Sequence, residues 1–178
     1  TLPDAIRWRG MHAYLCAGTP APKWSMERLA ALPNAQIHSS EGWSQTKFVN
    51  DTVQVTTPKS TYEFDRLIFG TGIRVDLDLR PELKAFAGKI ATWGDCYTPP
   101  KTLCDKNMAL YPYLGQGAQL TERVPGSAPH LGDIHVFNWG ATLSMGISSA
   151  SITGMKFGLR RIISSITREF YLEFAEGH

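Results

Sequence analysis

The clearest pattern of hydrophobic and polar positions lies near the C-terminus of the chain. Apolar residues recur there at spacings of three and four, and they are Ile152, Met155, Leu159, Ile162, Ile166 and Phe170. A stripe with this period predicts one long amphipathic helix from Ser148 to about Phe174. Gly154 and Gly158 lie four residues apart in it and would let another backbone approach closely. Because basic residues flank the stripe, we expect it to pack on a sheet rather than to dimerise in a membrane.

The stretch from residue 47 to residue 69 shows β-type runs separated by turn residues. Residues 47–49 and 52–57 flank Asn50-Asp51, which predicts a hairpin. Residues 62–64 alternate again and extend the hairpin to a three-stranded meander. Residues 66–69 lack polar alternation, which predicts a short strand buried on both faces.

The N-terminal segment is harder to assign, because residues 1–24 are rich in Pro, Gly and Trp and have no clean period. We expect a loop or lead-in there, with residues 13–17 as a candidate for one short buried element. Ser25 is a candidate N-cap for a short helix over residues 26–32, which Pro33 would end. Residues 35–38 are then expected to form a short strand.

Beyond residue 72 the pattern indicates a few short elements joined by irregular segments. A loop with one helical turn after Pro81 is expected first. Residues 89–93 predict a strand that ends at Gly94-Asp95, and residues 134–139 predict the last strand. The proline-rich stretch 96–133 between them is expected to be an ordered long loop, a kind of segment that is often functional.

Composition narrows the class of protein only a little. The chain has 178 residues, with 18 basic and 16 acidic side chains and a formal charge of +2. This nearly balanced charge does not indicate a nucleic-acid partner. Three cysteines without a Cys-x-x-Cys pair are expected to be reduced thiols in a cytoplasmic protein. No apolar run approaches the roughly 20 residues of a membrane span. The five histidines have no metal-ligand spacing, so no metal is expected.

Two glycine pairs invite comparison with dinucleotide-binding loops. Gly70-x-Gly72 follows an apolar run, but Val75 occupies the place of the third glycine and no helix pattern follows. Gly115-x-Gly117 has no strand before it. The sequence therefore shows no glycine-rich loop that would hold a pyrophosphate.

The order of the segments resembles the back half of the flavoproteins with two dinucleotide-binding domains, a family of FAD and NAD(P)H oxidoreductases and monooxygenases. In that family a meander leads into an Asp-x-hydrophobic strand closed by Ala-Thr-Gly, and residues 65–72 match this with Gly70 in place of alanine. A later strand of the family ends in Gly-Asp, as residues 90–95 do. A long C-terminal helix then follows in both.

The resemblance implies an α/β fold, with a partial Rossmann-like FAD/NAD(P)-binding architecture, a β-meander and a long C-terminal helix. Residues 1–72 would be the tail of an NAD(P)-binding-type domain, and residues 73–178 the C-terminal segment of an FAD-binding-type domain. The residues implied to bind the cofactor are Thr71, Gly72, Gly94, Asp95, Ile147 and Ser148. For each, a plain structural role stays open, because Gly-Asp is a common turn pair and serine a common helix cap.

The function implied is hydride transfer from NAD(P)H through FAD to a small-molecule substrate or oxygen. No residue is named as a catalytic acid or base. The missing initiator methionine and the missing glycine loop are both expected if the chain is the latter part of a longer flavoprotein. Homo-oligomerisation and association with the missing N-terminal half both stay open as partner predictions. The alternative is a non-catalytic module that binds a small ligand or a protein and no flavin.

Overall fold

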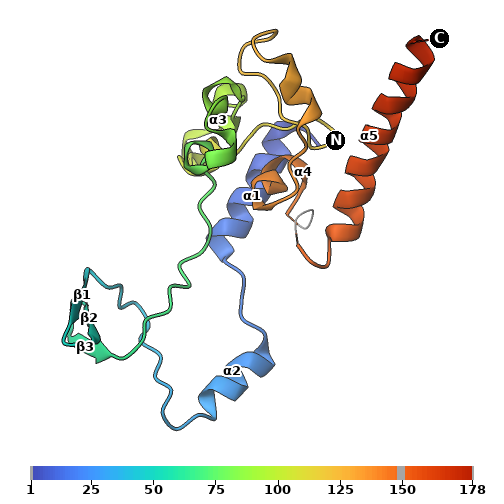
Figure 1. Cartoon of the computed structure of the whole chain (residues 1–178). Coiled ribbons are helices and arrows are strands. Elements are labelled where there is room, and N and C mark those ends of the chain that lie inside the picture. The colour runs from blue at the N-terminus through green and yellow to red at the C-terminus, as the bar shows by residue number, and fades with distance from the viewer. Residues whose placement is uncertain (1, 148–150, 178) are drawn as a thin grey trace. The chain divides into compact units, whose positions relative to one another are not determined.

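A three-stranded antiparallel sheet forms where the pattern predicts it, as the computed structural model of the chain shows (Figure 1). Its strands β1 (Gln45–Val49), β2 (Thr52–Thr56) and β3 (Thr61–Phe64) pair in that order. Asn50 and Asp51 have φ angles of +49° and +61°, which a two-residue hairpin turn requires and which these residue types tolerate. The predicted hairpin and meander are therefore confirmed.

The structure describes residues 2–147 and 151–177, and the chain divides into two compact units. The smaller unit, residues 20–72, holds α2 (Lys23–Ala30) and the sheet. The larger unit joins residues 1–19 to residues 73–178. The smaller unit ends at residue 72, and residues 1–19 lie in the same unit as residues 73–178. The assignment of these segments to NAD(P)-binding-type and FAD-binding-type domains stays a prediction.

The N-terminal segment is helical, so the expectation of a loop over residues 1–24 is wrong. Helix α1 (Asp4–Ala17) is followed by Gly18 with a φ of +67°. The residues that suggested a loop lie at helix ends, with Pro3 before α1 and Pro22 before α2, where proline costs no hydrogen bond. The helix has no hydrophobic period because it is fixed mainly through two buried side chains, Trp8 and Met11.

Three further expectations in the smaller unit are wrong. Helix α2 begins at Lys23 rather than after Ser25, and it ends at Ala30. Residues 35–38 form no strand, and residues 66–69 are irregular chain outside the sheet, with Ile68 90% exposed. A strand buried on both faces needs hydrogen-bonded neighbours, and the only sheet among the described residues is complete without this segment.

Between α1 and the C-terminal helix, the larger unit is built from short helices and irregular segments, and its core consists of two hydrophobic clusters. One cluster contains Ile90, Leu114, Leu120, Leu131 and Ile162, and the other contains Trp8, Trp93, Met108, Tyr111 and Leu143. Two of its α-helices are single turns, α3 (Trp93–Cys96) and α4 (Thr142–Met145). The 3-10 helices are η1 (Leu77–Leu79), η2 (Pro81–Leu83), η3 (Ala87–Lys89), η4 (Lys101–Leu103), η5 (Met108–Leu110), η6 (Pro129–Asp133) and η7 (Trp139–Ala141).

Irregular chain in the larger unit replaces two predicted strands. Residues 89–93 make only isolated bridges, between Ile90 and Glu122 and between Thr92 and Pro112, and residues 134–139 make one, between Gln119 and His135. Gly94 and Asp95 consequently lie inside α3 and not at the end of a strand. The stretch 96–133 is ordered through η4, η5 and η6, as expected, and the helical turn after Pro81 is η2.

The long C-terminal helix is confirmed, although it begins later than predicted. Helix α5 spans Met155–Glu176, while Ser148 lies outside the described residues. Ile162 and Gly158 are its buried residues, and Ile166 packs partly against the same cluster. Much of the predicted stripe is exposed, with Phe170 at 66%, and the described part of the larger unit offers no sheet for it to pack on.

The chain thus combines helices with one antiparallel sheet and a long C-terminal helix. Parallel strands do not occur among residues 2–147 and 151–177, so the Rossmann-like part of the predicted fold stays a prediction. Within those same residues no helix is both long and apolar enough to cross a bilayer.

Candidate functional site

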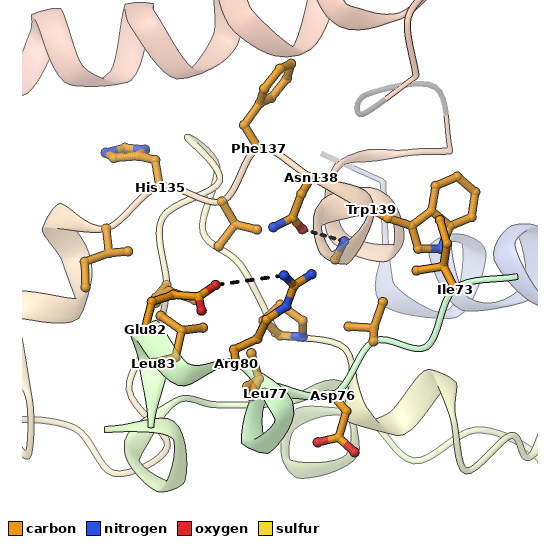
Figure 2. A pocket seen from close by; sticks show the side chains of 16 residues that line it. Ile73, Asp76, Leu77, Arg80, Glu82, Leu83, His135, Phe137, Asn138 and Trp139 are labelled. Atoms are coloured by element: carbon orange, nitrogen blue, oxygen red, sulfur yellow. Dashed lines mark hydrogen bonds and ion pairs between the residues drawn. The ribbon is translucent and has the colours of Figure 1, made fainter. Parts of the chain in front are cut away.

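A cavity of about 230 Å³ opens between three stretches of the larger unit (Figure 2). One side is formed by the segment from Ile73 to Leu83, which includes η1 and η2. The opposite side is the stretch 134–140, which leads into η7. Pro112 and Leu120 close it between them. Apolar side chains make most of the wall, so the few polar groups that face the cavity determine what it can bind.

Asn138 is the polar residue whose orientation the structure fixes best. It is the N-cap of η7, and its Oδ1 accepts a hydrogen bond from the Gly140 amide at 2.8 Å. Because a backbone N–H can only donate, the side-chain oxygen must face Gly140 and the Nδ2 group is left as a donor. No hydrogen bond from Nδ2 is found within the described residues. Asn138 therefore brings an amide donor to the cavity.

Arg80 and Glu82 bring one charge of each sign to the same cavity. Their closest atoms, Nη1 and Oε1, are 3.9 Å apart, and both side chains are at least half exposed. An exposed ion pair of this kind contributes about 0–1 kcal/mol to stability. It therefore does not hold either side chain in one fixed position. In Figure 2 the side chains of Arg80 and Asn138 point toward one another from opposite sides of the cavity.

Asp76 and His135, which also line the cavity, are already engaged. Asp76 accepts hydrogen bonds from the Arg74 guanidinium at 2.7 Å and from the Asp78 amide at 3.1 Å. The His135 Nδ1 lies 2.7 Å from the Gly117 carbonyl, so it must carry the proton and donate it. His135 thus holds the chain in place, as expected of a core or edge histidine.

The ring of Trp139 lines the cavity, while its Nε1 group donates to the Tyr111 hydroxyl at 3.0 Å. Burial raises the pKa of Tyr111, which keeps this phenol neutral. Trp139 and Phe137 give the cavity a partly aromatic wall that suits a flat ligand.

Asp95, predicted to bind the cofactor, has a local structural role. Its Oδ2 accepts from the Thr92 amide and hydroxyl, both at 2.8 Å, and from Arg123 Nε at 3.0 Å. The Thr92 contacts form a capping box at the start of α3. Burial opposes ionisation of Asp95, but the hydrogen bonds from Thr92 and Arg123 outweigh it and lower the pKa. The described residues bring no hydrogen bond to Oδ1, so one carboxylate oxygen is left to accept from a ligand.

Gly94 is explained by packing. A Cβ at this position would lie 3.2 Å from both the Ala109 Cβ and the Ala109 carbonyl oxygen. Such a contact is tighter than van der Waals distance, so glycine is what lets α3 approach η5. Whether Gly94 also faces a cofactor is still a prediction.

Ile147 comes next after Gly146, the residue with a φ of +105° that ends α4. It is half-buried against the cluster around Trp93, which places it in the same packed region as α3. Ile147 does not lie at the start of the last helix as predicted, because α5 begins only at Met155. The other residue predicted there, Ser148, lies outside the described residues. Thr71 and Gly72 are exposed residues at the end of the smaller unit, with Gly72 at a φ of +90°.

Sequence reasoning did not identify Asn138 and Arg80, whose side chains point toward one another across the cavity. Asn138 carries a signal that could have been used, since Asn-x-Gly after an apolar run is a common cap or turn. Arg80 before Pro81 carries none, because its place in the cavity depends on contacts made far along the chain. No group of three or more His, Cys, Asp or Glu side chains in the described ranges could hold a metal ion.

Comparison with known proteins found one relevant similarity. The chain is 33% identical over 172 residues, or 97% of its length, to the FAD-dependent urate hydroxylase of Xanthomonas campestris pv. campestris. The matched region is 36% of that relative, so the chain spans about a third of the length of the curated protein it matches. No family model matches the chain. No solved structure matches it either. The similarity supports the resemblance to FAD-dependent oxidoreductases that the order of motifs suggested.

Proposed function

We propose that this chain is part of an FAD-dependent oxidoreductase that uses NAD(P)H and oxygen to hydroxylate a small organic substrate. The observation that carries the proposal is the similarity to a protein named for FAD-dependent hydroxylation of urate. Because it extends over 97% of the chain, the similarity runs through both units and does not rest on one short motif.

The reaction balances with known co-reactants. NAD(P)H, a proton, oxygen and the substrate give NAD(P)⁺, water and the hydroxylated substrate, with one oxygen atom in each of the last two. A flavin, when bound, takes the hydride from the nicotinamide and delivers the electrons to oxygen. The protein's contribution is to position the substrate and to exclude water.

The residues of this chain fit only part of an FAD molecule. The free Oδ1 of Asp95 suits a hydroxyl donor, such as the ribityl chain of a flavin. In contrast, no helix in the described ranges starts from a glycine-rich loop that could cradle a pyrophosphate. The cavity of about 230 Å³ is also below the about 300–1,000 Å³ of sites for drug-sized ligands, so it cannot enclose a dinucleotide.

We therefore assign two tasks to this chain within the proposed enzyme. Asp95 would hold the flavin through its free carboxylate oxygen, and the cavity between Arg80 and Asn138 would hold a single small ring system. The pyrophosphate would be bound by glycine-rich chain elsewhere in the protein.

A binding module without flavin is the competing function, and the lack of a phosphate loop in the described residues favours it. One experiment separates the two. The full-length protein that carries this chain is purified, its absorbance spectrum is recorded before and after addition of FAD, and NADPH and NADH oxidation is followed with and without urate.

The enzyme proposal predicts a flavin spectrum and NAD(P)H oxidation that consumes oxygen. Hydroxylated product should accumulate when the correct substrate is present. A full-length protein that neither contains nor takes up flavin would rule out the oxidoreductase and leave the binding module.

A further inference from the structure

We propose that the outer face of helix α5 is a self-association surface, on which a second copy of this chain packs its own α5 in the antiparallel direction. The proposal rests on two features of this one helix, an exposed apolar stripe and an order of charges that only a partner can compensate. It goes beyond the proposed function, because neither a flavin nor a substrate takes part in the contact.

Helix α5 has a second apolar face besides the one that packs on the core. Gly158 and Ile162 are buried in the larger unit. In contrast, Leu159, Ile163 and Phe170 are 37%, 59% and 66% exposed. Residues four and seven apart lie on the same side of a helix, so these three side chains form one outer stripe. A single exposed apolar residue is ordinary, but a continuous stripe of them is typical of a contact surface.

The charged residues of α5 are arranged against the dipole of the helix. On either side of Arg168 they are grouped by sign, with Lys156, Arg160 and Arg161 toward the start and Glu169, Glu173 and Glu176 toward the end. A helix is stabilised by acidic groups in its first turn and by basic groups in its last turn, and α5 has neither. This order of charges destabilises the helix on its own, so a partner that compensates it must present the opposite order.

A second α5 in the antiparallel direction presents the opposite order. The basic half of each helix then lies beside the acidic half of the other, and the two helix dipoles oppose one another. With a two-fold axis between residues 164 and 165, Lys156 of each copy reaches the same height along the pair as Glu173 of the other. The same register places Leu159 at the height of Phe170, so the two outer stripes overlap. A parallel pair would bring like charges to the same height.

An anionic lipid surface is the other common partner of an amphipathic helix with basic residues. Such a surface would attract the basic half of α5 and repel the acidic half, which contains Glu173 and Glu176. A second copy is favoured because it compensates both halves.

The expected dimer is weak. Helix α5 has 22 residues and is therefore about 33 Å long. A single pair of helices of this length lies at the low end of the interface sizes of specific complexes, so we expect a dissociation constant of about 10–100 μM. The protein is then a monomer at the low micromolar concentrations of an unfolding experiment.

The first test compares two phenylalanines of α5 with nearly equal exposure. Phe170 is 66% exposed and belongs to the outer stripe, whereas Phe157 is 63% exposed and lies on the other side of the helix. Phe170→Asp should weaken self-association of the full-length protein at least about tenfold, because it buries a charge in the apolar contact. Phe157→Asp, the matched control, should leave it unchanged. Sedimentation equilibrium over a concentration series that brackets the expected dissociation constant measures both.

The second test reverses charges to establish the direction of the pair. Lys156→Glu and Glu173→Lys should each weaken association about threefold, because each brings like charges to the same height in the antiparallel dimer. The double variant restores opposite charges there and should associate as the parent protein does. Single and double variants that associate equally would overturn the antiparallel pairing.

A full-length protein that stays monomeric throughout the concentration series would overturn the inference. So would a dimer that Phe170→Asp and Phe157→Asp affect equally, because its interface would lie elsewhere. If the parent is a monomer and Phe170→Asp lowers its unfolding midpoint, another part of the same chain covers the stripe, which also contradicts a second copy. If Phe170→Asp does not fold, Leu159→Ser replaces it under the same criteria. None of these outcomes depends on flavin, so they leave the proposed function to its own experiment.

Discussion

The Trp93 indole N–H donates to the Ser144 hydroxyl at 2.9 Å and so ties α3 to α4 in the core of the larger unit. The same hydroxyl accepts from the Leu114 amide at 3.1 Å and donates to the Pro112 carbonyl at 3.1 Å. A hydroxyl has one donor and two acceptor sites, so Ser144 uses all three. It therefore joins three segments that lie far apart in the sequence.

Ser144→Ala is expected to destabilise the larger unit strongly. The buried Trp93 and Leu114 donors would each lose their partner, at about 1–3 kcal/mol per unsatisfied group. Urea unfolding followed by tryptophan fluorescence measures the loss. Ser127→Ala is the control, because Ser127 is exposed and its hydroxyl has no such role. Equal effects of the two substitutions would show that the network is not formed.

Two neighbouring residues of α5 provide a second stability test. Ile162 is 7% exposed and belongs to the cluster around Leu120, while Ile163 is 59% exposed. Ile162→Ala should cost about 2–5 kcal/mol, as for other buried large-to-small changes, and Ile163→Ala should stay within about 0.5 kcal/mol. Thermal unfolding of both variants decides the matter. A reversed order would mean that the helix docks through a different face.

The sequence predicted those elements whose cause is local. Asn50 and Asp51 specify the hairpin through their own backbone preference, and the period of three and four specifies α5. Helix α1 was missed because Trp8 and Met11 are held by contacts with residues about 90 positions away, such as the hydrogen bond from Trp8 to the Leu103 carbonyl at 2.8 Å.

The candidate site likewise contains features with a local cause and features that depend on contacts between distant parts of the chain. Asp95 was identified from the Gly-Asp pair. In the structure, Asp95 caps α3 and Gly94 allows close packing on Ala109, and a single sequence cannot distinguish these roles from ligand binding. The cavity could not be predicted, because Arg80 and Asn138 become neighbours only through folding. Strands at 90–93 and 134–139 were predicted from apolar composition, which does not reveal whether a pairing partner exists.

The role of Asp95 toward flavin can be tested with a substitution that preserves its cap. Asp95→Asn keeps one oxygen for the Thr92 hydrogen bonds and replaces the free oxygen with a donor. If Oδ1 accepts from the flavin, the full-length variant should retain FAD about two- to tenfold less tightly, the worth of one hydrogen bond. Equilibrium dialysis followed by absorbance measures the retention.

Arg123→Gln is the control for Asp95→Asn, because it removes the same ion pair and leaves both carboxylate oxygens as acceptors. It should retain FAD as the parent protein does. Equal retention by both variants would mean that Asp95 serves only α3, and equal loss by both would assign the effect to the ion pair.

The stability of the smaller unit should depend on pH through Glu41, and the direction of this dependence can be predicted. Its carboxylate accepts from the Thr57 hydroxyl at 2.7 Å and from the Tyr62 hydroxyl at 2.9 Å, and Lys59 lies 3.6 Å away. The Thr57 hydrogen bond is the main cause that lowers the pKa of Glu41 from 4.5 to about 2, against the opposing effect of burial.

A carboxyl whose folded-state pKa is lowered stabilises the fold above its unfolded pKa, and this contribution is lost as the pH falls through the folded value. Stability from Glu41 should therefore be complete above about pH 4.5 and disappear progressively down to about pH 2. Glu41→Gln should lower the urea midpoint at pH 6 and flatten the acid dependence over this window, as measured by circular dichroism of the smaller unit's sheet. Glu27→Gln, an exposed glutamate of α2, should leave the dependence unchanged. An acid profile of Glu41→Gln as steep as that of the parent would show that Glu41 titrates normally and that the network does not form.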